Sequence, residues 1–134
     1  MENKSKSFVG GDGTKSWYQN GLLHSTDGPA VEYAHGAKEW YQNGKLHCTD
    51  GPAVERLNGD RHWYQNGKRH RIDGPAVEGT DGYKAWYVNG IRHRTDGPAV
   101  EYGNGYKCWY LNGKSLTESQ FNSPSYREFV QLIG

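Results

Sequence analysis

Four His-x-x-Asp pairs are the residues with the most evident capacity for chemistry, because an imidazole beside a carboxylate can relay protons or bind a metal. One His and one Asp per unit cannot complete a tetrahedral zinc site when equivalent atoms of successive two-stranded units lie roughly 9–10 Å apart. We therefore interpret the pairs as structural: the His packs on a Trp and hydrogen-bonds a turn, and the Asp caps a turn. The pairs, spaced 23 residues apart, are His24 with Asp27, His47 with Asp50, His70 with Asp73, and His93 with Asp96.

The sequence lacks the other residue patterns that are typical of enzymes. It has no Ser/His/Asp or Cys/His constellation, no phosphate-binding glycine-rich loop and no aspartate cluster with calcium spacing. Cys48 and Cys108 are its only cysteines, and we interpret them as free thiols of a reducing cytoplasm. We expect a non-enzymatic protein that needs no metal and no cofactor.

A repeat of 23 residues organises the chain. Trp-Tyr recurs five times at this spacing, Asn-Gly follows in step, and Asp-Gly-Pro-Ala-Val-Glu recurs four times in the same register. A single hairpin cannot bury an aromatic face alone, so a repeat this short without helical periodicity predicts stacked β-hairpins. We expect the repeated tryptophans to form the structural core: Trp17, Trp40, Trp63, Trp86 and Trp109.

Two turns shape each unit. Asn58-Gly59 lies between two extended segments and predicts a hairpin with a two-residue type I′ turn, which would place Val54 opposite Trp63 and Ala53 opposite Tyr64. A second Asn-Gly turn then folds the chain back toward the Asp-Gly-Pro segment, which ends the return. The predicted fold class is all-β: an open single-layer solenoid of β-hairpin repeats with a short C-terminal α-helical cap. A propeller is disfavoured, because its blades need about 40 or more residues.

The two ends of the chain depart from the repeat. Residues 1–16 are predicted to form a polar tail and an incomplete capping hairpin, in which Phe8 takes the register of the repeated Val, and residues 17–114 to form the tandem repeats. Residues 115–134 are predicted to form the helical cap, with a capping box that begins at Thr117 and a second N-cap at Ser123. The apolar stripe of that cap would consist of Tyr126, Phe129, Val130 and Ile133.

Charge and hydropathy narrow the classes of partner. The chain has 16 Lys and Arg against 15 Asp and Glu, so no global field attracts nucleic acid or an anionic membrane. No stretch approaches 18 apolar residues, and the start MENKSKSF has no apolar run. We expect no targeting or membrane-spanning segment and a cytoplasmic location.

The unit Trp-Tyr-x-Asn-Gly-Lys-x-His-x-x-Asp-Gly-Pro-Ala-Val-Glu, as in residues 40–55, resembles the MORN-type repeats, which are also 23-residue β-hairpin units. It is most similar to variant arrays of bacteriophage and giant-virus proteins, and the likeness covers about residues 8–114. The chain departs from the common MORN unit at Trp-Tyr-x-Asn-Gly and His-x-x-Asp-Gly-Pro, which argues against the lipid binding proposed for some MORN proteins. The resemblance implies an interaction scaffold of viral origin that acts in a host cytoplasm.

Function is expected where the repeats differ, because packing already explains the shared positions. The return loops of the middle units carry arginines where the first unit has Leu23 and Ser25, and stacked loops would gather them into a patch suited to carboxylates or phosphates. A row of tyrosines on the face opposite Trp would be a second binding surface, or simply core if both faces are covered. The candidate binding residues are Arg69, Arg71, Arg92, Arg94, Tyr41, Tyr64 and Tyr87.

Three functions follow, in order of preference. The first is a phage protein that binds and modulates or inhibits a host protein, for example a component of host defence. The second is sequestration of a small anionic ligand such as a signalling nucleotide, held between arginines and aromatic rings. The third is nucleic-acid binding through the arginine loops, which the near-zero net charge disfavours. The sequence leaves the oligomeric state open.

Overall fold

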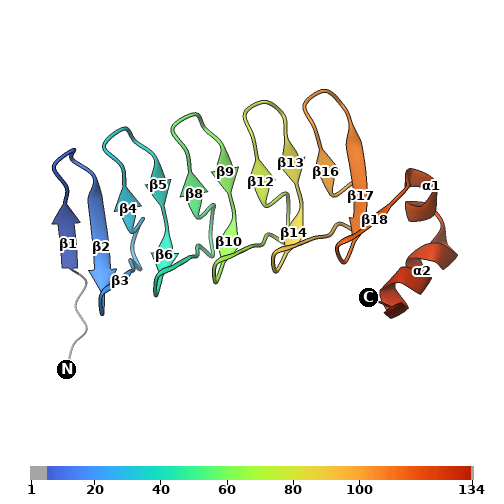
Figure 1. The fold of residues 1–134 in the computed structure, drawn as a ribbon, viewed down its shortest axis with the longest axis horizontal. Helices are drawn as coiled ribbons and strands as arrows, with labels where there is room; N and C mark the ends of the chain where they lie inside the picture. The colour runs from blue at the N-terminus through green and yellow to red at the C-terminus, as the bar shows by residue number, and fades with distance from the viewer. Residues whose placement is uncertain (1–5, 134) are drawn as a thin grey trace. The chain divides into compact units, whose positions relative to one another are not determined.

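The structure, a computed structural model, describes residues 6–133 and consists of antiparallel β-hairpins followed by two short helices (Figure 1). This confirms the all-β class and the helical C-terminal segment. The chain divides into two compact units, with the boundary between Lys68 and Arg69. Among the described residues, no helix is both long enough and apolar enough to cross a membrane.

The first unit contains two longer strands near its start, followed by strands of two residues. Strand β11 lies at the boundary between the units. The strands are β1 (Lys6–Val9), β2 (Lys15–Gln19), β3 (Leu22–Leu23), β4 (Val31–Glu32), β5 (Lys38–Glu39), β6 (Tyr41–Gln42), β7 (Lys45–Leu46), β8 (Val54–Glu55), β9 (Arg61–His62), β10 (Tyr64–Gln65) and β11 (Lys68–Arg69).

The second unit continues the same pattern and ends in the helices. Its elements are β12 (Val77–Glu78), β13 (Lys84–Ala85), β14 (Tyr87–Val88), β15 (Ile91–Arg92), β16 (Val100–Glu101), β17 (Lys107–Leu111), β18 (Lys114–Leu116), α1 (Glu118–Phe121) and α2 (Pro124–Ile133).

The register of the hairpins differs from the prediction by one residue. Val54 lies opposite His62, so the predicted pairs of Val54 with Trp63 and of Ala53 with Tyr64 were wrong. The Trp positions instead pair with the following repeat: the N–H of Trp40 donates to the carbonyl of Ala53 at 2.7 Å. Trp40 therefore joins its repeat to the next and does not close its own hairpin. At the two ends, Trp17 lies opposite Ser7 of the first hairpin and Trp109 lies opposite Leu116.

The hairpin loop explains this shift. Backbone hydrogen bonds close a three-residue loop. The N–H of Arg56 donates to the carbonyl of Asp60 at 2.9 Å, and the N–H of Gly59 donates to the carbonyl of Arg56 at 3.0 Å. Gly59 has φ 97°, whereas Asn58 keeps a negative φ and accepts from the N–H of Asp60 at 3.0 Å through its side chain. This is the type I turn with a following bulge residue, stabilised by an Asx turn.

The two-residue type I′ turn occurs instead in the return loops. Asn43 and Gly44 have φ values of 51° and 80°, and strands β6 and β7 pair on either side of them. Both central residues of a type I′ turn need positive φ, which Asn and Gly tolerate best. Each repeat thus combines a bulged hairpin with a tight return.

Within each unit, neighbouring hairpins pair edge to edge. Strand β2 pairs with β4, β5 with β8, and β13 with β16, so the hairpins lie side by side (Figure 1). The buried core includes the repeated Ala-Val dipeptides as well as Ala85 and Leu111, while all five repeated tryptophans are half-buried. The prediction that the tryptophans form the core was therefore wrong in part. The repeated residues that are buried are Ala30, Val31, Ala53, Val54, Ala76, Val77, Ala99 and Val100.

The chain ends in a strand and two capped helices. Both predicted caps are confirmed: Thr117 forms a capping box with Gln120, and the Ser123 hydroxyl accepts from the N–H of Tyr126 at 3.3 Å. The predicted apolar stripe is only partly buried. Val130 joins the core of Leu111, Leu116 and Phe121, whereas Tyr126 and Phe129 are exposed, and the side chain of Ile133 lies outside the described residues.

At the start of the chain, strands β1 and β2 form the first hairpin, with four residue pairs. Phe8 lies opposite Ser16, which is also the partner of Val31. Every residue of β1 is exposed. The prediction of a polar tail cannot be compared with the structure over residues 1–5, which lie outside the described residues.

Candidate binding sites

The side chains of each strand alternate between two faces of the sheet. In the second unit, Tyr87 packs against the buried Val77, Ala85 and Val100, while Trp86 lies on the other face. The tyrosine-bearing side of this unit also carries two of the candidate arginines. We call it the tyrosine–arginine face, and it consists of Arg69, Tyr83, Tyr87, Arg92, Tyr102, Tyr106 and Tyr110.

Arg92 is held at the centre of this face by two tyrosines. Its Nε donates to the hydroxyl of Tyr87 at 3.1 Å and its Nη1 to that of Tyr110 at 3.4 Å. Its guanidinium also stacks 5.9 Å and 5.4 Å from the centroids of the same two rings, and that of Arg69 lies 5.6 Å from the Tyr87 centroid. Among the described residues, Arg92 forms no ion pair with a carboxylate, so its positive charge is not neutralised there.

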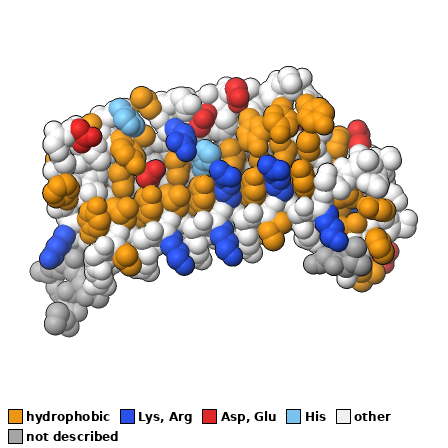
Figure 2. Space-filling model, viewed as in Figure 1, with side chains coloured by type: hydrophobic (Ala, Val, Ile, Leu, Met, Phe, Trp, Pro, Cys, Tyr) orange, Lys and Arg blue, Asp and Glu red, His pale blue; other side chains and the backbone are white. Residues whose placement is uncertain are grey.

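The remaining tyrosines extend the face outward. The rings of Tyr83 and Tyr102 meet edge to face at 5.3 Å, and Tyr102 lies 5.8 Å from Tyr106. Tyr102 is 42% and Tyr106 64% exposed, which is high for such large rings. Burial raises the pKa of the Tyr83 hydroxyl above its ordinary value. Figure 2 shows hydrophobic side chains, tyrosine included, gathered on one face with basic side chains among them.

The other two candidate arginines serve the fold. Arg94 donates from Nε to Asp96 at 2.9 Å and from Nη1 to the carbonyl of Pro98 at 3.0 Å, and it stacks on Trp86 at 3.8 Å. Arg71 makes the equivalent bonds to Asp73 and to the carbonyl of Pro75, and pairs with Glu78 at 3.0 Å. These guanidinium groups hold their own Asp-Gly-Pro loops, and the four arginines do not form one patch.

In the first unit, two tyrosines share one carboxylate, that of Glu39. The Oε1 atom of Glu39 accepts hydrogen bonds from the hydroxyls of Tyr33 and Tyr41, both at 3.1 Å. Burial, and then the Glu39 charge, raises the pKa of Tyr41 to about 12. Tyr64, the third candidate tyrosine, stacks near His62 with ring centroids 6.5 Å apart. The sequence left open whether the candidate tyrosines belong to the core or to the surface. All three are half-buried, which is intermediate between the two.

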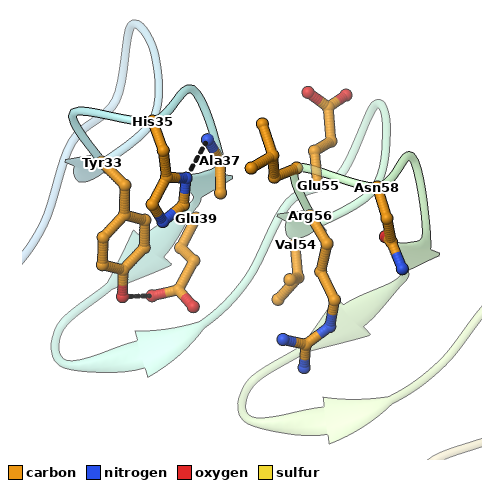
Figure 3. Close-up of a pocket in the computed structure, with 9 residues that line it drawn as sticks. Tyr33, His35, Ala37, Glu39, Val54, Glu55, Arg56 and Asn58 are labelled. Carbon is orange, nitrogen blue, oxygen red and sulfur yellow. Dashed lines mark hydrogen bonds between the residues drawn. The ribbon is translucent and has the colours of Figure 1, made fainter.

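A cavity of about 460 Å³ opens between the hairpins β4–β5 and β8–β9 (Figure 3). Tyr33, His35 and Glu39 line it from one hairpin, and Arg56 and Leu57 from the next. The imidazole of His35 stacks on the Tyr33 ring at 5.3 Å with an interplanar angle of 6°. Sequence reasoning missed this site, although one signal was present: small Ala37 stands where later repeats carry Tyr83 and Tyr106.

The two members of each His-x-x-Asp pair have separate partners, and Asp73, for example, accepts from Nε of Arg71 at 3.1 Å. The Nδ1 atom of His70 accepts from the N–H of Asn89, in the return turn of the following repeat, at 3.0 Å. The described residues include no group of three or more His, Cys, Asp or Glu side chains that could hold a metal ion. The same His bond recurs from His24 to Asn43, from His47 to Asn66 and from His93 to Asn112.

Comparison with known proteins adds no further constraint on function. No known family model matches the chain, and no curated protein matches it either.

Proposed function

We propose that this chain is a non-enzymatic tandem-repeat binding protein whose partner is another protein. The observation that carries the proposal is Arg92, which is fixed between the rings of Tyr87 and Tyr110 and has no carboxylate partner among the described residues. Protein interfaces are enriched in Tyr and Arg, and their strongest contacts concentrate on such side chains.

The rigidity of the face supports this proposal. Binding normally costs about 0.5–1.5 kcal/mol for each flexible side chain that becomes ordered. Arg92 is already ordered by two hydroxyls, and Tyr102 is fixed between Tyr83 and Tyr106. A partner that brings a carboxylate to Arg92 and apolar groups to the tyrosines would therefore bind without much ordering cost.

The open solenoid and the viral role are parts of the same proposal. Edge-to-edge pairing of hairpins within each unit supports an open array, because such pairing can continue from repeat to repeat without closing. The phage origin, the cytoplasmic site of action and the inhibition of a host protein rest on the resemblance to viral MORN-like arrays.

Affinity capture from a bacterial lysate tests this proposal. The immobilised chain is compared with the double variant Arg92→Gln and Tyr106→Ala, which removes the central charge and the most exposed ring of the face. We expect the wild type to retain a specific protein, and the double variant to retain at least about tenfold less of it, since each interface anchor contributes about 2 kcal/mol or more.

The matched control is Lys107→Gln, which removes an exposed positive charge from the opposite side of the sheet. It should retain the partner as the wild type does. The absence of any specifically retained protein, or equal retention by the wild type and the double variant, would contradict the proposal.

A further inference from the structure

The cavity between the hairpins β4–β5 and β8–β9 is separate from the tyrosine–arginine face and has its own chemistry. Its volume of about 460 Å³ lies within the range of small-molecule sites. Val54 and Leu57 give it apolar walls, and the stacked rings of Tyr33 and His35 give it a flat one. Both hairpins belong to the first unit.

The cavity lies where the first unit differs from the second at two facing positions. In the second unit, two repeat lengths further along the chain, Tyr83 and Tyr102 fill the equivalent space with their rings 5.3 Å apart. In the first unit, the strand register brings Ala37 and Arg56 to those two positions. A methyl group thus replaces a phenol, and the space that the phenol would occupy stays open.

Two carboxylates and one guanidinium line the cavity: those of Glu39, Glu55 and Arg56. No described residue forms an ion pair with Glu39 or Arg56. The Glu39 carboxylate accepts only from the two neutral tyrosine hydroxyls, both on Oε1. The Arg56 guanidinium forms no hydrogen bond or ion pair within the described part of the chain. Burial and the Glu39 charge raise the pKa of Tyr33, and the Arg56 charge is close enough to offset part of that rise. Figure 3 shows both groups extending to the same side from neighbouring hairpins, while Glu55 points the opposite way.

We propose that this cavity binds a small zwitterion, an amino acid or dipeptide with an apolar side chain. Its ammonium group pairs with Glu39, its carboxylate pairs with Arg56, and its side chain lies against Tyr33, Val54 and Leu57. A purely anionic ligand would meet the uncompensated Glu39, and a purely cationic one would meet Arg56. The site is independent of the proposed protein partner, so each proposal can fail without the other.

Titration of the isotope-labelled full chain with L-phenylalanine and with a phenylalanine dipeptide tests the proposal, using amide NMR shifts and calorimetry. We expect saturable shifts that centre on residues 33–39 and 54–58. Acetylating the amine of the probe, or amidating its carboxylate, should each weaken binding at least about tenfold, because each removes one charge-assisted contact.

Three variants complete the test. Glu39→Gln keeps the tyrosine hydrogen bonds but removes the charge, and Ala37→Tyr fills the cavity with the side chain that the second unit uses there. Each should abolish saturable binding or weaken it at least about tenfold. The control Glu32→Gln removes the carboxylate at the equivalent position of strand β4, which does not line the cavity, and should leave the affinity unchanged.

Thermal unfolding of each variant separates loss of binding from loss of fold. If Ala37→Tyr fails to fold, Glu39→Gln decides the question alone. The proposal is overturned if neither probe binds at millimolar concentration, if the blocked probes bind as tightly as the zwitterions, or if Glu39→Gln binds like the wild type.

Discussion

The Nδ1 atom of His70 accepts a hydrogen bond at 3.0 Å from the backbone N–H of Asn89, a residue of the following repeat with φ 50°. The imidazole therefore holds the return turn of the next repeat, in which Asn89 has a left-handed backbone conformation. The same bond recurs at the other three repeated histidines. Only a histidine whose Nδ1 carries no proton can accept it.

Stability should therefore fall in mild acid. Burial lowers the pKa of His93 below its usual value of 6.5, so the unfolded chain takes up this proton first as the pH falls. The contribution of His93 is thus fully present above about pH 6.5 and is lost as the pH falls below that value. Urea unfolding between pH 8 and pH 5 should show this decrease, at about 1 kcal/mol for loss of the His93 bond to Asn112.

The variant His93→Gln identifies the source of that decrease. It should be less stable than the wild type at pH 8 and should lose less stability than the wild type between pH 8 and pH 5. A free energy of unfolding that stays constant over this range in the wild type would disprove the role assigned to the histidines.

The free energy of unfolding should depend strongly on which residue occupies the Asn position of a return turn. Asn43 has φ 51°, a conformation that costs most residues roughly 1–2 kcal/mol and glycine almost nothing. Asn43→Gly should therefore change the free energy of unfolding little, whereas Asn43→Val should lower it by about 1–2 kcal/mol. Chemical denaturation of the two variants at pH 8 checks this, and equal stability would argue against a strained turn.

Arg94 should matter for stability much more than its salt-bridge partner does. Its half-buried guanidinium bonds the carbonyl of Pro98 and stacks on Trp86, whereas the Asp96 side chain is 83% exposed. Exposed ion pairs contribute about 0–1 kcal/mol, so Asp96→Asn should be nearly neutral. Arg94→Gln should lower the unfolding free energy by about 1–3 kcal/mol. Equal effects in thermal unfolding would contradict this assignment.

The C-terminal helices should depend on one buried valine. Val130 is 2% exposed and packs with Leu111, Leu116 and Phe121, whereas Leu132 is 80% exposed. Truncating a buried aliphatic side chain costs transfer and cavity energy, so Val130→Ala should destabilise the protein by about 1–3 kcal/mol. The control Leu132→Ala should stay within about 0.5 kcal/mol of wild type by urea denaturation. A cost as small for Val130→Ala as for this control would show that α2 does not depend on the buried contact.

The constant period made the hairpins and the helix caps predictable, but not the register. Asn58-Gly59 fits both a two-residue type I′ turn and a three-residue loop with a bulge. The choice depends on the Asn58 side chain, which accepts the N–H of Asp60 and holds its own φ negative. One extra loop residue moves every cross-strand partner by one, which is why Val54 meets His62 and not Trp63.

The candidate sites were only partly predictable, for a related reason. Arg92 and Arg94 are two residues apart and look equivalent in the sequence, yet Arg92 lies in strand β15, opposite Tyr87, and Arg94 follows the strand. Leaving the strand brings Arg94 to the carboxylate of Asp96 in its own loop. The cavity in the first unit needed the register as well, because only the register brings Ala37 opposite Arg56.

The most direct test of the central claim is an NMR footprint of the captured partner on the isotope-labelled chain. Binding is predicted to broaden or shift the signals of Tyr87, Arg92, Tyr102, Tyr106 and Tyr110, and to leave those of Trp86 and the Asp-Gly-Pro loops unchanged. A footprint on the tryptophan side or on those loops would contradict the account.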